Sequence, residues 1–373
     1  MAQILSRVAD PITSTNSLAV FHIKPEADAL LRGDVRIHFG FTITTTAGNY
    51  APFNKELGAW AAIKEIRILD GSGYRLWHLR EADRYAAWQL LRMSSSATRD
   101  VEFELSRNQS AFSVYSAGFH VMKTNDNLTA NASTTARVML NLSRLCDLFS
   151  SALPLQRMGG MRIEIEWHTT AARIFSNSGV VTAFAPSEPQ LSYSLLLSPL
   201  VVEKMAAEVQ IKYTEPRLTV QGVGLNPADA SLPLGGAGEA VNTIITQLVT
   251  AAGAYTAPDG ATSAVNLTVN GKKLFPVNLD RGGQCATTPI AAGTDAFMPV
   301  GGWYPLPTNT LGLTNFAGHK AFWAVDLRPM QNAPPSVVNS TKIDSSGVYY
   351  NISATQAATT LYAYMVESRV VKV

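Results

Sequence analysis

Apolar and polar residues alternate with a period of two along much of this chain. The runs 35–43 and 161–167 show the pattern most clearly, because apolar side chains occupy every second position in each. Shorter runs at 101–105, 138–142 and 265–279 repeat it. Alternation of this kind predicts strands that turn one face toward a core.

Two tight turns are predicted between these strands. Asn270-Gly271 interrupts the alternating run 265–279, and this dipeptide favours a two-residue hairpin because both central residues of the turn take positive φ. The segment 70–73 contains two glycines and lies between apolar positions on both sides, which indicates a second turn.

Helical patterns are few. Residues 80–93 place one set of apolar side chains on a common helical face: Ala82, Tyr85, Ala86, Leu90 and Met93. Residues 144–150 and 201–209 are each predicted to form a short helix or a turn or two of one. Many strands, few helices and closely spaced turn residues indicate β-sandwiches or barrels.

Two segments rich in glycine, alanine or proline are predicted to be long loops. Residues 222–238 show no sustained alternation, and residues 282–313 contain Gly301-Gly302 and two further prolines. Loops of this length usually carry function or an interface. Simple disorder is the alternative for both.

Composition fits a protein of two β-rich domains. The chain has 373 residues, of which 46% are hydrophobic and 16% are charged. A low charged fraction favours surfaces that become buried against other subunits. An ordinary β-protein with a surface of serine, threonine and asparagine is the alternative.

The net charge and the number of cysteines limit which classes of partner and which cellular compartment we expect. The formal net charge is +2 and no basic run occurs, so direct sequence-specific binding or wrapping of nucleic acid is not expected. Cys146 and Cys285 are too few for a disulfide framework and are expected to be reduced thiols. No apolar stretch has the length of a membrane span and no signal peptide is visible, so we expect a soluble, cytoplasmic chain until assembly.

No catalytic, cofactor-binding or metal-ligating residue is predicted. The six histidines are scattered, without the spacing of a zinc site. Glu164 and Glu166 share a strand face and could serve glycoside hydrolysis, or form the solvated or subunit-facing side of that strand.

Two further groups admit a binding role. Asp280, Asp295 and Asp326 could hold a structural cation through loop oxygens. Trp303-Tyr304 and Phe322-Trp323 could form a platform for sugars, although such residues more often fill β-sandwich cores or subunit interfaces.

Three segments carry a resemblance to a known family. Residues 61–93 order a strand, a turn, a strand and a helix. Residues 136–167 order a strand, a short apolar helix, a Leu-Pro-Leu step and an alternating strand, and residues 337–373 contain NSTKID, VYYNI and LYAYMVESRVVKV. Their order and spacing resemble the double jelly-roll major capsid proteins of the adenovirus–tectivirus lineage of tailless icosahedral viruses.

The resemblance implies an all-β fold of two tandem eight-stranded jelly-roll barrels with a few short helices. The first roll is expected at 1–203, with an N-terminal arm at about 1–14 that faces inward or is disordered, and the second at 204–373. The implied function is a non-enzymatic major capsid protein, of a bacteriophage, that assembles as pseudo-hexagonal homotrimers into an icosahedral shell.

The implied partners are the chain itself, neighbouring capsomers, and penton and minor capsid proteins, in a virion made in the host cytoplasm. Whether a membrane lies beneath the shell stays open, as do the host, the genome type and the lattice size. Two other functions remain: a two-sandwich carbohydrate-binding or receptor-binding module, and a hydrolase on a tandem jelly-roll scaffold.

Overall fold

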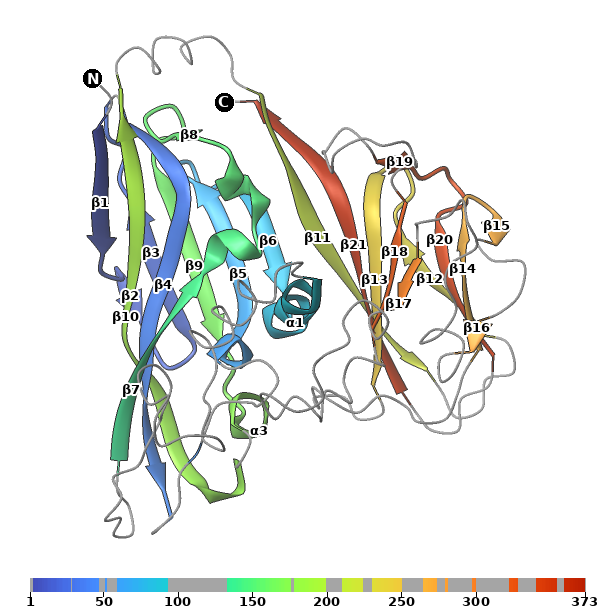
Figure 1. Ribbon diagram of the computed structural model, residues 1–373, viewed down its shortest axis with the longest axis horizontal. Coiled ribbons are helices and arrows are strands. Elements are labelled where there is room, and N and C mark those ends of the chain that lie inside the picture. Colours follow the sequence, from blue (N-terminus) through green and yellow to red (C-terminus); the bar gives the residue numbers. More distant parts are fainter. Residues whose placement is uncertain are drawn as a thin grey trace. The chain divides into compact units, whose positions relative to one another are not determined.

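The computed structural model describes residues 3–27, 29–46, 51, 59–92, 133–175, 178–198, 210–223, 230–249, 264–273, 279–280, 297–299, 322–327, 340–353 and 359–372. The chain divides into two compact units (Figure 1): Met1–Tyr213 with Val370–Val373, and Thr214–Arg369. The predicted strand at 101–105 and the predicted helix at 201–209 lie outside the described residues, as does most of the segment 282–313.

The first unit contains two antiparallel sheets. One has the strand order β1-β10-β4-β7, with β8 also paired to β4; its strands are β1 (Gln3–Ala9), β10 (Val181–Leu197), β4 (Ala29–Thr45), β7 (Ser133–Asn141) and β8 (Leu153–Pro154). The other has the order β2-β3-β9-β5-β6; its strands are β2 (Thr13–Ser14), β3 (Leu18–Ile23), β9 (Met161–Trp167), β5 (Ile63–Asp70) and β6 (Arg75–Arg80). Residues of the expected N-terminal arm thus form β1 and β2.

The predicted strands at 35–43 and 161–167 supply the core between these two sheets. The alternating apolar side chains of β4 are fully buried, and those of β9 have the same periodicity. The rings of Phe39 and Trp167 lie 4.8 Å apart, and Phe41 contacts Trp167 edge-on at 6.5 Å. Each such side chain contributes about 1.5–3 kcal/mol through burial. Both strand predictions are confirmed, because the two runs lie in β4 and β9 and their apolar faces meet in the core.

The turn between β5 and β6 lies where the sequence predicts it. Asp70 Oδ1 accepts hydrogen bonds from the backbone N–H groups of Ser72 and Tyr74, at 2.9 and 2.8 Å. Gly73 has φ +87°, and a Cβ atom at Gly71 would overlap the carbonyl oxygen of Gly159. Both glycines are therefore required by the backbone of this turn.

Short helices cover parts of the first unit. They are η1 (Ala59–Ala62), α1 (Ala82–Arg92), η2 (Leu142–Arg144), η3 (Asp147–Ser150), α3 (Ala171–Ile174) and η4 (Ser178–Val180). The helix predicted at 80–93 is confirmed as α1, with Ala82, Tyr85 and Ala86 buried. The short helical segment predicted at 144–150 corresponds to η2 and η3.

The second unit also contains two antiparallel sheets. One has the order β11-β21-β13-β18-β17, with β19 paired to β13; its strands are β11 (Gln210–Val223), β21 (Thr359–Lys372), β13 (Ala240–Val249), β18 (Phe322–Asp326), β17 (Phe297–Pro299) and β19 (Thr341–Lys342). The other has the order β12-β20-β14-β15, with β16 paired to β14; its strands are β12 (Ala230–Gly235), β20 (Val348–Ser353), β14 (Ala264–Val269), β15 (Lys272–Lys273) and β16 (Leu279–Asp280). Buried residues such as Val241, Ile244 and Tyr350 belong to one core cluster.

The hairpin predicted at Asn270-Gly271 is confirmed. β14 pairs antiparallel with β15, and the two turn residues have φ +51° and +71°. These are the positive φ values that a two-residue turn of this kind requires.

The same strand order occurs in both units. β1-β10-β4-β7 in the first unit corresponds to β11-β21-β13-β18 in the second, and β3-β9-β5-β6 corresponds to β12-β20-β14-β15. In each unit, the first strand pairs with the last. This arrangement of two facing antiparallel sheets is the jelly roll, and the predicted all-β fold of two tandem rolls is confirmed.

The prediction of a loop throughout 222–238 is wrong. β11 extends to Val223, and Ala230–Gly235 forms β12, which pairs antiparallel with β20. Pro233 hid this strand from sequence analysis, but β12 lies at the end of its sheet, where a missing N–H is tolerated. A turn follows it, with positive φ at Gly235, Gly236 and Gly238.

Candidate functional site

Among the described residues, the most buried group of charged side chains lies at the start of α1. Asp83 and Arg84 come from its first turn, and Arg173 and His168 reach them from α3 and from the residue after β9. Arg173 Nη2 lies 2.9 Å from Asp83 Oδ2 and 2.5 Å from Glu81 Oε2, and His168 Nε2 lies 3.3 Å from Asp83 Oδ2. The cluster therefore ties the start of α1 to the segment 168–173, which is distant from it in sequence.

This cluster has the electrostatics of an ion-pair network. Burial alone would raise the pKa of Asp83, but the charge of Arg173 and the His168 contact outweigh it, so the pKa lies below its usual value. Glu81, Asp83 and His168 lie close enough to share a cation. The guanidinium groups of Arg173 and Arg84 already neutralise the two carboxylates, so this donor set does not fit a metal ion.

Sequence analysis missed these residues. A predicted amphipathic helix places its apolar positions inside, and nothing in its pattern indicates that Asp83 and Arg84 are buried as well. Their burial depends on partner side chains from a distant segment, and a single sequence does not indicate which distant residues meet.

Glu164 and Glu166 lie in a ladder of ion pairs on the second sheet of the first unit. Glu164 contacts Arg162 at 2.6 Å and Arg67 at 3.1 Å, and Glu166 contacts Lys64 at 2.5 Å. Each carboxylate thus faces cations on its own or a neighbouring strand. This arrangement favours the interpretation of a polar strand face over a pair of hydrolytic acids, because both carboxylates are engaged by fixed positive charges.

The second unit contains a cluster of three glutamates and two arginines. Glu367 on β21 accepts a hydrogen bond from Arg217 Nε at 2.6 Å and from Arg369 Nη2 at 2.7 Å. Arg217 also contacts Glu239 at 2.9 Å, and Arg369 contacts Glu215 at 3.2 Å. Burial and the neighbouring Glu239 raise the pKa of Glu367 to about 8, against the opposing charges of the arginines.

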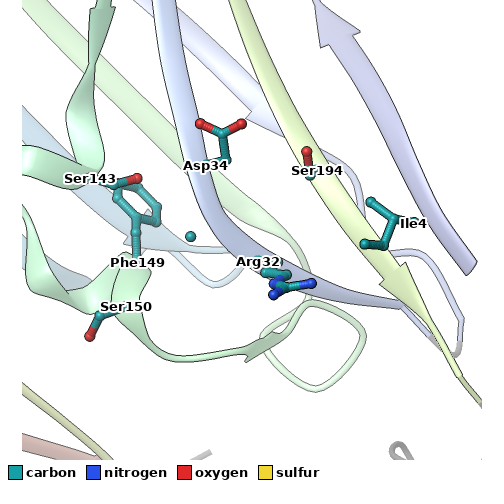
Figure 2. Close-up of a pocket in the computed structure, with 8 residues that line it drawn as sticks. Ile4, Arg32, Asp34, Ser143, Phe149, Ser150 and Ser194 are labelled. Carbon is teal, nitrogen blue, oxygen red and sulfur yellow. The ribbon is translucent and has the colours of Figure 1, made fainter. Parts of the chain in front are cut away.

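A shallow hollow of about 530 Å³ opens on the first sheet of the first unit. Figure 2 shows its lining: Ile4 on β1, Ser194 on β10, Arg32 and Asp34 on β4, and Ser143, Phe149 and Ser150 on η2 and η3. Asp34 accepts a hydrogen bond from Arg36 at 2.7 Å. Gly33 of β4 is the eighth lining residue, and the eight include neither histidine nor cysteine, so the serines have no imidazole or thiolate partner within the lining.

The remaining binding hypotheses fall largely outside the described residues. Outside the described residues lie Trp303-Tyr304, Asp295 and Cys285. The strand β18 contains Phe322-Trp323 and Asp326, and only its strand pairing is described. Cys146 is buried and forms no disulfide bond within the described residues. Within the described part of the chain, the helices are too short or too polar to span a membrane.

Apolar side chains are exposed on the first strand. Ile4 and Val8 on β1 are 57% and 65% exposed, and Ile12, just beyond the strand, is 66% exposed. These side chains are available for contact with another surface.

Comparison with known proteins gives no match in sequence. No family model matches the chain. No curated protein matches it either.

Comparison with solved structures gives matches along the whole chain. A chain of the Sputnik virophage cryo-EM structure superimposes with a TM-score of 0.62 at 10% identity, over 100% of this chain and 88% of that one. The PBCV-1 virus capsid model gives 0.60 at 12% identity, over 100% and 94%. The Faustovirus major capsid protein gives 0.58 at 10% identity, over 100% and 90%. This chain therefore has the double jelly-roll fold of these viral capsid proteins.

Proposed function

We propose that this chain is the major capsid protein of a tailless icosahedral virus, and that it works by self-assembly without turnover. The observation that carries the proposal is the repeat of one strand order in both units of a single chain. The likeness to viral capsid structures extends over all of this chain, so both units take part in it.

The tandem repeat suggests how the chain would build a shell. Three copies of a chain with two similar rolls present six similar units around one axis, so a homotrimer can fill a hexagonal position in a lattice. Trimers would then meet neighbouring trimers and, at special positions, penton and minor capsid proteins. We place the protein in the virion, after synthesis in the host cytoplasm.

The exposed apolar residues and the low charge support assembly. Only 16% of residues are charged, which lowers the cost of removing surface from water. Each contact between capsomers can be weak, since many contacts act together in a closed lattice.

The test is the mass of the purified chain in solution by light scattering. We expect a stable particle of three 40.1 kDa chains, and shells by electron microscopy once the protein is concentrated. A clean monomer that binds sugars on a glycan array would contradict the proposal in favour of the carbohydrate-binding alternative.

A further inference from the structure

The free edge of β1 lacks the proline and lysine that protect several other edge strands of this molecule. Within the described residues, β1 has a strand neighbour on one side, β10, and stands at the end of its sheet. A free edge presents unpaired N–H and C=O groups that can accept another strand. Several other edge strands of this molecule are protected by proline, by lysine or by their shortness, as in β12 with Pro233, β15 with two lysines and β17 with Pro299. β1 contains neither residue type and has 7 residues.

The sequence of β1 is complementary to itself when reversed. If two copies of Gln3–Ala9 pair antiparallel about Ser6, then Ile4 of one copy lies opposite Val8 of the other, twice over. Leu5 lies opposite Arg7 in the same register, and Ser6 lies opposite Ser6. Residues directly opposite in an antiparallel pair project from the same face, so the exposed Ile4 and Val8 would cover one another.

We propose that β1 pairs with β1 of a second copy of this chain, antiparallel about a two-fold axis at Ser6, so that two first-unit sheets become one continuous sheet. The strand pairing itself rests on the edge and its register. Its place in the shell rests on the proposed function: a two-fold contact uses the same patch on both copies and cannot close a trimer, so it joins chains of different trimers.

The size of this contact fits a role in a lattice. A pair of seven-residue strands buries less than the roughly 1,000 Å² that a stable isolated interface needs. The contact is therefore weak alone and effective when many act together. A covalent trap is the appropriate way to detect it.

Cysteine substitutions test the register directly. In Ser6→Cys, the two new thiols face each other at the two-fold axis, with Cα atoms about 4.5–5.5 Å apart, which a disulfide can bridge. In Gln3→Cys, each thiol lies six residues from its counterpart along the strand, roughly 20 Å away. Under mild oxidation of concentrated protein, we expect a disulfide-linked dimer from Ser6→Cys. Gln3→Cys should stay at the wild-type level, which corrects for Cys146 and Cys285.

Charge substitutions test the pairing of Ile4 with Val8 in the Ser6→Cys background. Val8→Glu places a carboxylate opposite the partner's Ile4 and should lower the disulfide yield at least fivefold. Adding Ile4→Lys restores the yield, because each introduced ammonium group then faces an introduced carboxylate of the other copy. Val220→Glu, at a residue 44% exposed in the second unit, is the matched control and should change nothing.

The outcomes separate this inference from the proposed function. Equal yields from Ser6→Cys and Gln3→Cys, or failure of the double substitution to restore the yield, would overturn the strand pairing. If light scattering shows a trimer under reducing conditions but Ser6→Cys forms no disulfide-linked dimer, the strand pairing is overturned and the proposed trimeric capsomer is still supported. If the protein is a monomer under reducing conditions but Ser6→Cys still forms the disulfide-linked dimer, the strand pairing is supported and the trimeric capsomer is contradicted.

Discussion

Two buried carboxylates show how opposite environments act on the same chemical group. The side chains of Asp83 and Glu367 are each 1% exposed. For Asp83, burial is outweighed by Arg173 and His168, so its pKa lies below the usual value. For Glu367, burial and Glu239 outweigh two arginines, so its pKa rises to about 8. The two units therefore respond to pH in opposite directions at these residues.

The Glu367 cluster predicts a loss of stability toward alkaline pH. Between the ordinary glutamate pKa of 4.5 and the folded-state pKa of about 8, the folded protein holds a proton that the unfolded chain has lost. The stability from this residue is complete below pH 4.5 and declines as pH rises to about 8, by up to about 1.4 kcal/mol per pH unit. Glu239→Gln removes the repelling charge, lowers the pKa of Glu367 and should flatten this decline. Urea unfolding at pH 5 and pH 8 measures it, and an unchanged slope would contradict the assignment.

The Asp83 cluster predicts a large cost for losing a single cation. Arg173→Met leaves a buried carboxylate without its main partner and should lower the free energy of unfolding by about 3–5 kcal/mol at neutral pH. Because the pKa of Asp83 is depressed, its stabilising effect is present above the unfolded value near 3.8 and disappears as pH falls through the folded one. The penalty, measured by urea unfolding, should shrink accordingly in acid.

A second variant separates charge from packing in that cluster. Asp83→Asn combined with Arg173→Met removes both charges, so chemical denaturation should show less loss than the sum of the two single substitutions. Strict additivity would mean that the two residues do not interact.

At the scale of elements, close backbone contacts fix the turns. Gly71, between β5 and β6, lies against the backbone of Gly159, in the turn before β9. Gly71→Ala should destabilise the protein by about 3 kcal/mol, since the methyl group displaces a backbone segment and not a flexible side chain. Gly179→Ala is the control, because a Cβ atom there meets nothing within 4 Å. Thermal unfolding of both variants is the measurement, and equal shifts would show that the Gly71 contact is absent.

Strands with one buried face were predictable from the sequence, and strands at sheet ends were harder. Alternation located β4 and β9 because each packs one face against a single core. β12 was missed because Pro233, its glycine and its alanine weaken the pattern, which an edge strand tolerates. The buried ion pairs were not predictable, since Asp83 and Arg173 acquire their roles only when α1 and α3 meet.

At the scale of the whole molecule, the balance of positive and negative charge determines how strongly nucleic acid is expected to bind. The chain carries 30 basic and 28 acidic residues. Many of the described arginines, such as Arg67, Arg173 and Arg217, face carboxylates of the same chain.

This balance predicts weak binding to nucleic acid. By fluorescence anisotropy, binding of the purified protein to duplex DNA should be no tighter than about 10⁻⁴ M at physiological salt, with a shallow salt dependence. A steep loss of affinity between about 50 and 200 mM salt would reveal a basic surface and contradict this prediction.

The pairing of the first strand with the last has a consequence for synthesis on the ribosome. Gln3 pairs with Leu197, so β1 emerges long before its partner β10 exists. At roughly 5–20 residues per second, the interval is roughly 10–40 s. During that time both edges of β1 are open, and Ile4 and Val8 are available to any extended chain nearby. Neighbouring ribosomes on one message would bring such chains together, so the nascent β1 strand is where chaperone protection would matter most for this protein.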